Sequence, residues 1–257
     1  MDRLLEATAR AERDHFWFHG FRRFVSPLLE QAAAGRSNLL SLDCGCGTGN
    51  NLSLLRRFGR AAGIDLTLSG LRYAGSRGER SVAQASAASL PFRSDAFDLV
   101  TSFDVIYSLP DDAERAAVAE MFRVLKPGGH LVLNVAALEM LKGNHSVLSG
   151  EIRRYSTRQL RTVLEPPGFE IVRLTYTNAT ILPIVAATRL LQRVGGHEES
   201  AQEISVPPAP VNAALTGLLA LESIALRFVN MPFGTSALAL ARKPSLPTSN
   251  SHAPIPN

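Results

Sequence analysis

Short apolar runs and longer amphipathic segments alternate along most of the chain. The apolar runs are typical of buried strands, and they lie at residues 39–43, 61–65, 82–85, 97–104, 130–137, 169–177 and 237–242. The segments with helical spacing fall between them, at residues 51–58, 67–76, 111–125 and 156–164. Because strands alternate with helices, the pattern predicts an α/β fold with a doubly wound sheet and helices on both faces.

Local signals mark several ends of the predicted helices. Asp111 and Ser156 each begin a helical pattern and are expected to cap it, Ser156 within the sequence S-T-R-Q. Residues 126–129 read K-P-G-G. Proline and glycine in this order are typical of a helix stop, so the helix over 111–125 is expected to end there before the next strand begins.

The N-terminal segment, residues 1–34, carries aromatic residues at helical spacing with arginines between them. This periodicity predicts a docking helix whose aromatic side chains join the core. The central segment, residues 35–178, contains six of the seven predicted strands and should form the main body of the domain.

Two strongly apolar segments follow, at residues 179–193 and 211–229, and a polar linker with prolines joins them. The first is too short to span a bilayer, and the second carries Glu222 and Arg227. We expect packing helices that complete the domain over 179–244. The alternative is an apolar acceptor pocket or a peripheral membrane contact.

Composition narrows the function classes. The chain has 257 residues, 46% hydrophobic and 19% charged, with a formal net charge of +4. It can bury a large core in one domain. No basic run alternates with aromatic residues, so nucleic acid is not expected as a partner. The charged N-terminus does not resemble a signal peptide, which favours a cytoplasmic protein. The C-terminal residues 245–257 are expected to be a disordered tail.

The centre of the pattern is the loop after the first predicted strand. Residues 43–49 read D-C-G-C-G-T-G, with glycine at every second position from Gly45. Glycine lets a ligand approach the main chain closely. The spacing differs from the G-x-G-x-x-G of dinucleotide sites. Asp43 would face a pyrophosphate poorly, but it suits a ligand with ammonium and sulfonium charge.

Both cysteines, Cys44 and Cys46, lie in this loop. Two cysteines in C-x-C spacing form neither a disulfide framework nor a zinc set, so no metal site is expected. We interpret them as small loop residues, and a redox role is the alternative. Asp65 ends the next strand 20 residues beyond Gly45, near the separation of roughly 20 at which an acid reaches a ribose diol. Leu66 could then pack on an adenine face.

The loop resembles motif I of class I S-adenosylmethionine (SAM)-dependent methyltransferases. Residues 86–92 resemble the family's G-D-A-x-x-L-P-F, although Ser86 stands in place of the usual aspartate. F-D-L-V at 97–100 and R-V-L-K-P-G-G at 123–129 resemble the small bacterial type-11-like (UbiE-like) subfamily. Tyr107 and Ser108 stand where relatives often carry Glu-His.

The resemblance implies a seven-stranded Rossmann-like sheet whose last strand, at 237–242, is an antiparallel edge strand. It also implies SAM as methyl donor, with S-adenosylhomocysteine (SAH) as product. The N-terminal aromatic helix would then cover the cofactor as a lid. The candidate cofactor-binding residues are Asp43, Gly45, Cys46, Gly47, Asn51, Asp65, Leu66, Ser86, Ala87 and Phe103. Four of them, Gly45, Asp65, Ser86 and Phe103, fall at predicted strand ends, and these meet at one edge of such a sheet.

An insertion at residues 138–155 follows the fifth predicted strand and should lie over the cofactor. It resembles the family segment N-H-D…G-H-x-R-R-Y. The candidate catalytic residues are His145, Glu151 and Tyr155, and the candidate acceptor-binding residues are Arg153, Arg154, Tyr107 and Trp17. The alternative is a polar surface loop whose arginines pair with nearby acids.

These observations predict a methyltransferase that acts on a small-molecule acceptor, one that could be anionic, amphiphilic or lipid-like, by in-line displacement at the methyl carbon. A non-catalytic SAM-binding module is the alternative. A nicotinamide-dependent dehydrogenase is disfavoured because the third glycine of its loop is missing. The oligomeric state is left open.

Overall fold

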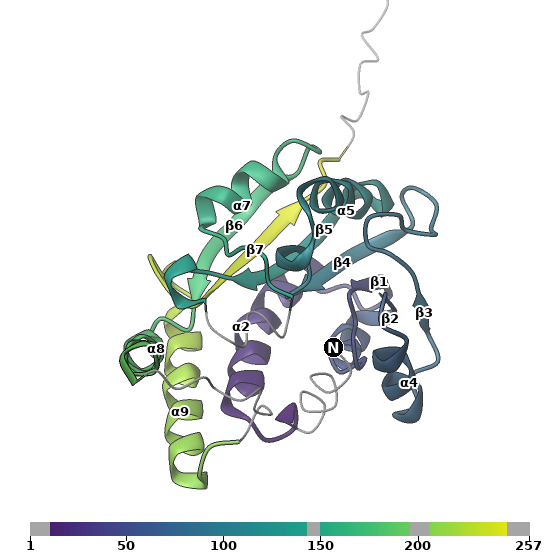
Figure 1. Cartoon of the computed structure of the whole chain (residues 1–257). Helices are drawn as coiled ribbons and strands as arrows, with labels where there is room; N and C mark the ends of the chain where they lie inside the picture. The colour runs from purple at the N-terminus through teal and green to yellow at the C-terminus, as the bar shows by residue number, and fades with distance from the viewer. Residues whose placement is uncertain (1–10, 143–149, 196–205, 246–257) are drawn as a thin grey trace, which may run out of the picture.

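The computed structural model describes residues 11–142, 150–195 and 206–245. Its centre is a seven-stranded sheet in the order β3-β2-β1-β4-β5-β7-β6 (Figure 1). The strands are β1 (Leu39–Cys44), β2 (Gly59–Asp65), β3 (Val82–Gln84), β4 (Phe97–Phe103), β5 (Leu125–Ala136), β6 (Glu170–Thr177) and β7 (Ser236–Arg242). The first five strands pair in parallel, and β7 is antiparallel to both neighbours. The predicted doubly wound sheet is therefore confirmed.

Helices cover both faces of the sheet (Figure 1). One apolar cluster joins the sheet to α5 (Asp111–Val124) and α7 (Thr157–Leu164). A second cluster joins the other face to α2 (Phe16–Ala33), α3 (Leu52–Leu55) and α9 (Ala209–Ala225). The remaining α-helices with described bounds are α4 (Leu68–Ser76) and α8 (Leu182–Gly195), and short 3-10 turns lie at η1 (Arg56–Phe58), η2 (Ile106–Ser108) and η3 (Glu139–Leu141).

The position predicted for the last strand was wrong. β7 is antiparallel as expected, but it lies between β5 and β6, so β6 is the edge strand. The physical reason is visible in the burial pattern: every residue of β7 except Arg242 is buried, whereas β6 alternates with exposed positions. An Ala-Leu-Ala-Leu strand fills an interior place better than an edge.

Two predicted boundaries also needed correction. The N-cap of α5 is Pro110, and Asp111 is its first helical residue. The K-P-G-G segment does not separate the helix from the strand. It belongs to β5, which begins at Leu125 directly after the helix. Its pairing with β4 shifts in register, and Gly128, with φ of 78°, donates its N–H to Lys243 O at 2.8 Å. The segment is thus an irregular part of the strand.

Two further helices differ in length from the prediction. The helix after the glycine loop is the single turn α3, followed by η1. Within the described part of the N-terminal segment, α2 begins only at Phe16, where the His15 side chain accepts from the N–H of Trp17. The capping box predicted at Ser156 is confirmed, because Ser156 and Gln159 cap one another reciprocally at the start of α7.

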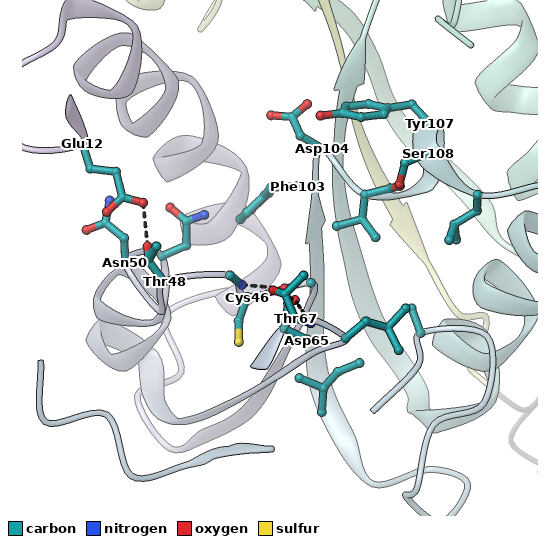
Figure 2. Close-up of a pocket in the computed structure, with 18 of the residues that line it drawn as sticks. Glu12, Cys46, Thr48, Asn50, Asp65, Thr67, Phe103, Asp104, Tyr107 and Ser108 are labelled. Atoms are coloured by element: carbon teal, nitrogen blue, oxygen red, sulfur yellow. Dashed lines mark hydrogen bonds between the residues drawn. The ribbon is translucent and has the colours of Figure 1, made fainter. Parts of the chain in front are cut away.

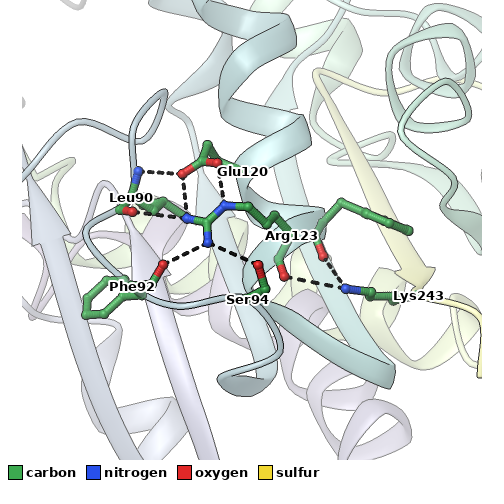
Figure 3. A network of polar contacts seen from close by, with 7 residues as sticks. Leu90, Phe92, Ser94, Glu120, Arg123 and Lys243 are labelled. Carbon is green, nitrogen blue, oxygen red and sulfur yellow. Dashed lines mark hydrogen bonds and ion pairs between the residues drawn. The ribbon is translucent and has the colours of Figure 1, made fainter.

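A polar network fastens the loop after β3 to α5 (Figure 3). Arg123 donates to Phe92 O at 2.8 Å and to Leu90 O at 3.1 Å, while Glu120 accepts from the N–H of Leu90 at 2.7 Å. Lys243 donates to Leu125 O at 2.7 Å near the helix C-terminus. The network holds the segment that carries Ser86 and Ala87 in place beside the sheet edge.

The second apolar C-terminal segment packs on the N-terminal helix. Leu219 of α9 is fully buried against α2, where a Cβ on Gly20 would lie 2.4 Å from Leu219 Cδ1. None of the helices in the described residues is both long and apolar enough to cross a membrane. The other side of α9 leaves apolar side chains in solvent, with Leu221 67% and Ile224 54% exposed, and Phe228 just after the helix is 82% exposed.

Candidate functional site

A pocket of about 410 Å³ opens at the carboxyl ends of the parallel strands. Its volume is in the range of small-molecule sites, about 300–1,000 Å³. The lining residues come from α2 and the segment before it, from the ends of β2 and β4, from the loops after β1, β2, β3 and β4, and from η2. They are Glu12, Trp17, Phe18, Phe21, Gly45, Cys46, Gly47, Thr48, Asn50, Asn51, Ile64, Asp65, Leu66, Thr67, Ala85, Ser86, Ala87, Phe103, Asp104, Val105, Tyr107, Ser108 and Leu109. Every predicted cofactor residue except Asp43 is in this set.

The glycine loop presents bare main chain to the pocket. Gly45, Gly47 and Gly49 all have positive φ, of 85°, 51° and 76°. The N–H groups of Gly45 and Cys46 both donate to Ile64 O, at 2.8 and 2.9 Å, which ties the loop to β2. A Cβ on Gly45 would lie 2.2 Å from Val105 Cγ2, so no other residue fits there without displacement.

The Asp65 carboxylate accepts hydrogen bonds from the glycine loop and from Thr67 (Figure 2). Its Oδ2 accepts from the N–H of Gly47 at 2.8 Å, and its Oδ1 accepts from the N–H and the hydroxyl of Thr67. Each carboxylate oxygen has two lone pairs. Oδ1 therefore already accepts two hydrogen bonds, whereas Oδ2 accepts one and keeps a lone pair for a ligand hydroxyl. Ser86 lies on the next loop, where its hydroxyl accepts from the N–H of Ala88 at 3.2 Å.

Asp43 lies beneath the loop and not on the pocket wall, with 1% of its surface exposed. Thr101 donates to Asp43 Oδ1 at 2.7 Å, and Oδ2 has no hydrogen-bond partner among the described residues. Burial raises the pKa of Asp43 to about 7; the Thr101 hydrogen bond opposes this, and the charge of Asp65 adds to it. The predicted contact with a cationic ligand stays a prediction, although positive charge in the pocket would favour the ionised form.

Both cysteines are free and buried. Burial, followed by the nearby charge of Asp43, raises the pKa of both thiols. Each therefore stays protonated and unreactive near neutral pH. Within the described residues no group of three or more His, Cys, Asp or Glu side chains is arranged to hold a metal ion.

The N-terminal segment closes one side of the pocket. Trp17, Phe18 and Phe21 of α2 line it, and the Phe21 ring meets Phe103 edge-on with centroids 5.0 Å apart. Glu12 fastens the segment, since it accepts from the Thr48 hydroxyl at 2.7 Å and pairs with Arg77 at 2.7 Å. These contacts agree with the lid interpretation of the aromatic segment.

Asp104 is a pocket residue that the sequence analysis missed. It follows β4 with φ of 59°, and its Oδ1 accepts from Asn134 Nδ2 of β5 at 3.0 Å. The Asp104 side chain is exposed to solvent through the pocket. Desolvation by the neighbouring protein raises the pKa of Asp104 and solvent limits this effect; the Asn134 hydrogen bond opposes it, the charge of Glu151 adds to it and that of Arg154 opposes it. Only its place after F-D-L-V could have signalled it.

None of the described residues of the insertion lines the pocket, but the insertion lies behind its wall, where the N–H groups of Ile152 and Arg153 donate to Tyr107 O at 3.0 and 3.3 Å. Arg153 pairs with Asp111 at 2.6 Å and with Glu114 at 2.8 Å, and Tyr155 donates to Glu114 from a site that is 3% exposed. Burial and this hydrogen bond raise the pKa of Tyr155. These contacts favour the alternative interpretation, a loop whose arginines pair with nearby acids.

Three other residues of the insertion were predicted as site residues: Glu151, Arg154 and His145. Glu151 and Arg154 form an ion pair with each other, and Arg154 also donates to Ala137 O at 3.1 Å. His145 lies outside the described residues. Of the predicted acceptor residues, Trp17 and Tyr107 line the pocket.

The charged side chains among the described residues that line the pocket are all acidic. Its charged lining residues are Glu12, Asp65 and Asp104, and no Lys, Arg or His is among the described residues that line it. Together with the bare glycine loop, this lining fits SAM, which carries sulfonium and ammonium groups. It fits an anionic dinucleotide poorly.

Comparison with known proteins agrees with this geometry. Residues 42–133 match the family model described as "Methyltransferase domain". A Mycolicibacterium smegmatis protein named "Probable S-adenosylmethionine-dependent methyltransferase" is 30% identical over 162 residues, which are 62% of this chain and 61% of that protein. The ubiquinone/menaquinone biosynthesis C-methyltransferase UbiE of Shewanella halifaxensis is 31% identical over 156 residues, 55% of this chain and 58% of that protein. The chain thus spans about three fifths of the length of each.

Solved structures share the fold. The Haemonchus contortus phosphoethanolamine N-methyltransferase 2, solved with SAM, superposes with a TM-score of 0.61 at 18% identity, over 95% of this chain and 58% of that one. At this identity the likeness concerns the fold alone.

Proposed function

The chain belongs to the class I SAM-dependent methyltransferases, and from this premise we propose that it transfers a methyl group from SAM to a small-molecule acceptor. The observation that carries the proposal is the pocket at the carboxyl edge of the sheet. There the glycine loop, Asp65 and Ser86 meet an aromatic wall, and the charged side chains that line it are acids.

The residues at the glycine-loop end are proposed to hold SAM. The bare main chain of Gly45 and Gly47 allows close approach, and Asp65 Oδ2 would accept from a ribose hydroxyl. Leu66, Ser86 and Ala87 would surround the adenine, with Asn51 and Phe103 completing the wall. Asp43 would act from beneath the loop through its charge.

SAM supplies an already activated methyl group on a sulfonium. The work left to the chain is to hold an acceptor lone pair in line behind the methyl carbon, and such positioning can supply most of the rate enhancement. Trp17, Phe18 and Phe21 support this role because they close the pocket from the α2 side and exclude water. In-line displacement needs no further protein nucleophile.

The test is methyl transfer from labelled SAM into the small-molecule fraction of a cell extract. We expect transfer by the wild-type protein and a loss with Asp65→Asn. A charge-assisted hydrogen bond contributes about 1.5–3 kcal/mol, so SAM affinity should fall about 10- to 100-fold. Asp112→Asn is the matched control, since Asp112 is 98% exposed on α5 and outside the pocket.

The outcome also separates the alternative function. SAM binding without transfer to any acceptor would favour a non-catalytic SAM-binding module. The placement of Glu151 and Tyr155 in contacts outside the pocket is the observation that keeps this alternative in view.

An amphiphilic acceptor was expected because the C-terminal apolar helices could line its pocket, but the pocket is lined by other elements. None of the described residues of α8 and α9 lines the pocket, so its apolar surface comes from α2 and η2 instead. The membrane contact predicted for the C-terminal helices stays a prediction. The exposed Leu221, Phe228 and Phe233 support it, and co-sedimentation with anionic vesicles tests it.

A further inference from the structure

We propose that the acceptor is an amine, held as a cation by the Asp104 carboxylate against the aromatic wall of the pocket. The proposal deepens the proposed function and rests on it, since it assigns the chemistry of the second substrate in the same pocket. Three observations carry it: the position of Asp104, the absence of an ion-pair partner for it among the described residues, and the aromatic residues that line the same pocket.

Asp104 lies on the side of the pocket away from the predicted ribose and adenine residues. In Figure 2, Asp104 and Tyr107 occupy one wall, whereas Asp65 and Thr67 lie across the pocket. The strand order explains this separation. Asp65 follows β2, while Asp104 follows β4 and its carboxylate is held by Asn134 of β5, farther along the sheet. A ligand that fills the Asp65 end would leave Asp104 facing what remains of the pocket.

The Asp104 carboxylate is available to a ligand. Among the described residues it makes no ion pair, and Asn134 is the side chain that donates to it. The positive charge of Arg154 is near enough to lower the pKa of Asp104, but the ion pair of Arg154 is with Glu151. By contrast, Glu12 is paired with Arg77, and Asp65 already accepts from Gly47 and Thr67. Asp104 has φ of 59°, a costly conformation for a residue other than glycine, which persists only where the surrounding structure fixes the residue.

Aromatic rings complete the subsite. Trp17, Phe18, Phe21, Phe103 and Tyr107 all line the pocket. Ring faces attract cations, and a carboxylate beside such rings recognises an ammonium group better than a neutral or anionic one. The two arginines that the sequence predicted for an anionic acceptor, Arg153 and Arg154, are paired with acids outside the pocket. The geometry therefore favours a cation over an anion.

The chemistry balances without another reactant. The bound ammonium gives one proton to the Asp104 carboxylate, which frees the nitrogen lone pair. The lone pair forms a bond to the methyl carbon of SAM as the carbon–sulfur bond breaks, and the electrons of that bond stay on sulfur in SAH. The product leaves as the methylated ammonium, and Asp104 releases its proton to solvent. The carboxylate thus binds the acceptor and serves as its base.

The experiment compares three probes of nearly equal shape by calorimetry: choline, the neutral 3,3-dimethylbutan-1-ol and the anionic 3,3-dimethylbutanoate. Each is titrated into the protein alone and into protein saturated with SAH. We expect choline to bind about tenfold or more tightly than either isostere. Asp104→Asn should remove that preference while SAH affinity and the circular dichroism spectrum stay unchanged, and Asp112→Asn should retain it.

Equal affinity for choline and the alcohol, or tighter binding of the carboxylate, would overturn the proposal. So would a choline preference that persists in Asp104→Asn. A parallel loss of SAH affinity in that variant would assign Asp104 to the cofactor instead. Failure of the wild-type protein to bind SAH would refute the proposed function, and the titrations without SAH would still decide whether the pocket selects a cation.

Discussion

Replacing Gly45 by alanine tests how the glycine loop shapes the pocket. Gly45 has φ of 85°, and an added Cβ would lie 2.2 Å from Val105 Cγ2. The left-handed conformation costs a residue with a Cβ about 1–2 kcal/mol, and overpacking costs about 1–3 kcal/mol more. We therefore expect Gly45→Ala to lower the free energy of unfolding by about 2–5 kcal/mol and to weaken SAM binding, because the loop must move.

The assay is urea unfolding combined with SAM titration. Gly75→Ala is the matched control, since Gly75 lies in α4 with no atom within 4 Å of its added Cβ. In a double-mutant cycle, Val105→Ala should recover about 1–3 kcal/mol of the loss in the Gly45→Ala background, leaving the backbone strain. An unfolding free energy within about 0.5 kcal/mol of wild type for Gly45→Ala alone would refute the steric argument.

Three further predictions concern individual polar groups. The folded pKa of Asp43, about 7, lies above the ordinary value of 3.8. Wild-type stability should therefore fall as pH rises from about 4 to about 7, by up to about 4 kcal/mol. Asp43→Asn should lack this fall in urea unfolding, and parallel pH curves would contradict the burial argument. Ser156→Ala removes the capping box of α7 and should lower the unfolding free energy by about 1 kcal/mol; an unchanged urea midpoint would show that the cap contributes nothing. Arg153→Ala leaves Glu114 without its cation and should lower the unfolding free energy by about 1.5–3 kcal/mol. Turnover of the remaining folded protein should be unchanged, and a large rise in KM with normal stability would return Arg153 to acceptor binding.

The pocket wall around the glycine loop could be predicted because it depends on local order along the chain. Parallel strands place their carboxyl ends at one edge, so each residue that follows a predicted strand was a candidate. Gly45, Asp65 and Ser86 were found in this way. Asp43 ends a strand too, but its pairing with Thr101 directs its side chain under the loop. Strand register with a distant segment decides this, and periodicity does not reveal it.

The acceptor half depends on contacts between segments far apart in sequence. Glu114 lies 39 residues before Arg153 and 41 before Tyr155, and it engages both. Asp104 becomes notable only through Asn134, 30 residues later, and through its positive φ. The interior place of β7 likewise follows from pairing with both β5 and β6. A polar motif in sequence could not distinguish a side chain open to the pocket from one already paired.

The most direct test of the central claim is calorimetric titration of the wild-type protein with SAM, SAH and NAD in parallel. The account predicts micromolar binding of SAM and SAH with no detectable binding of NAD, because the pocket combines a bare glycine loop with acidic side chains. Binding of NAD in place of SAM would contradict the assignment of the pocket and leave only the fold.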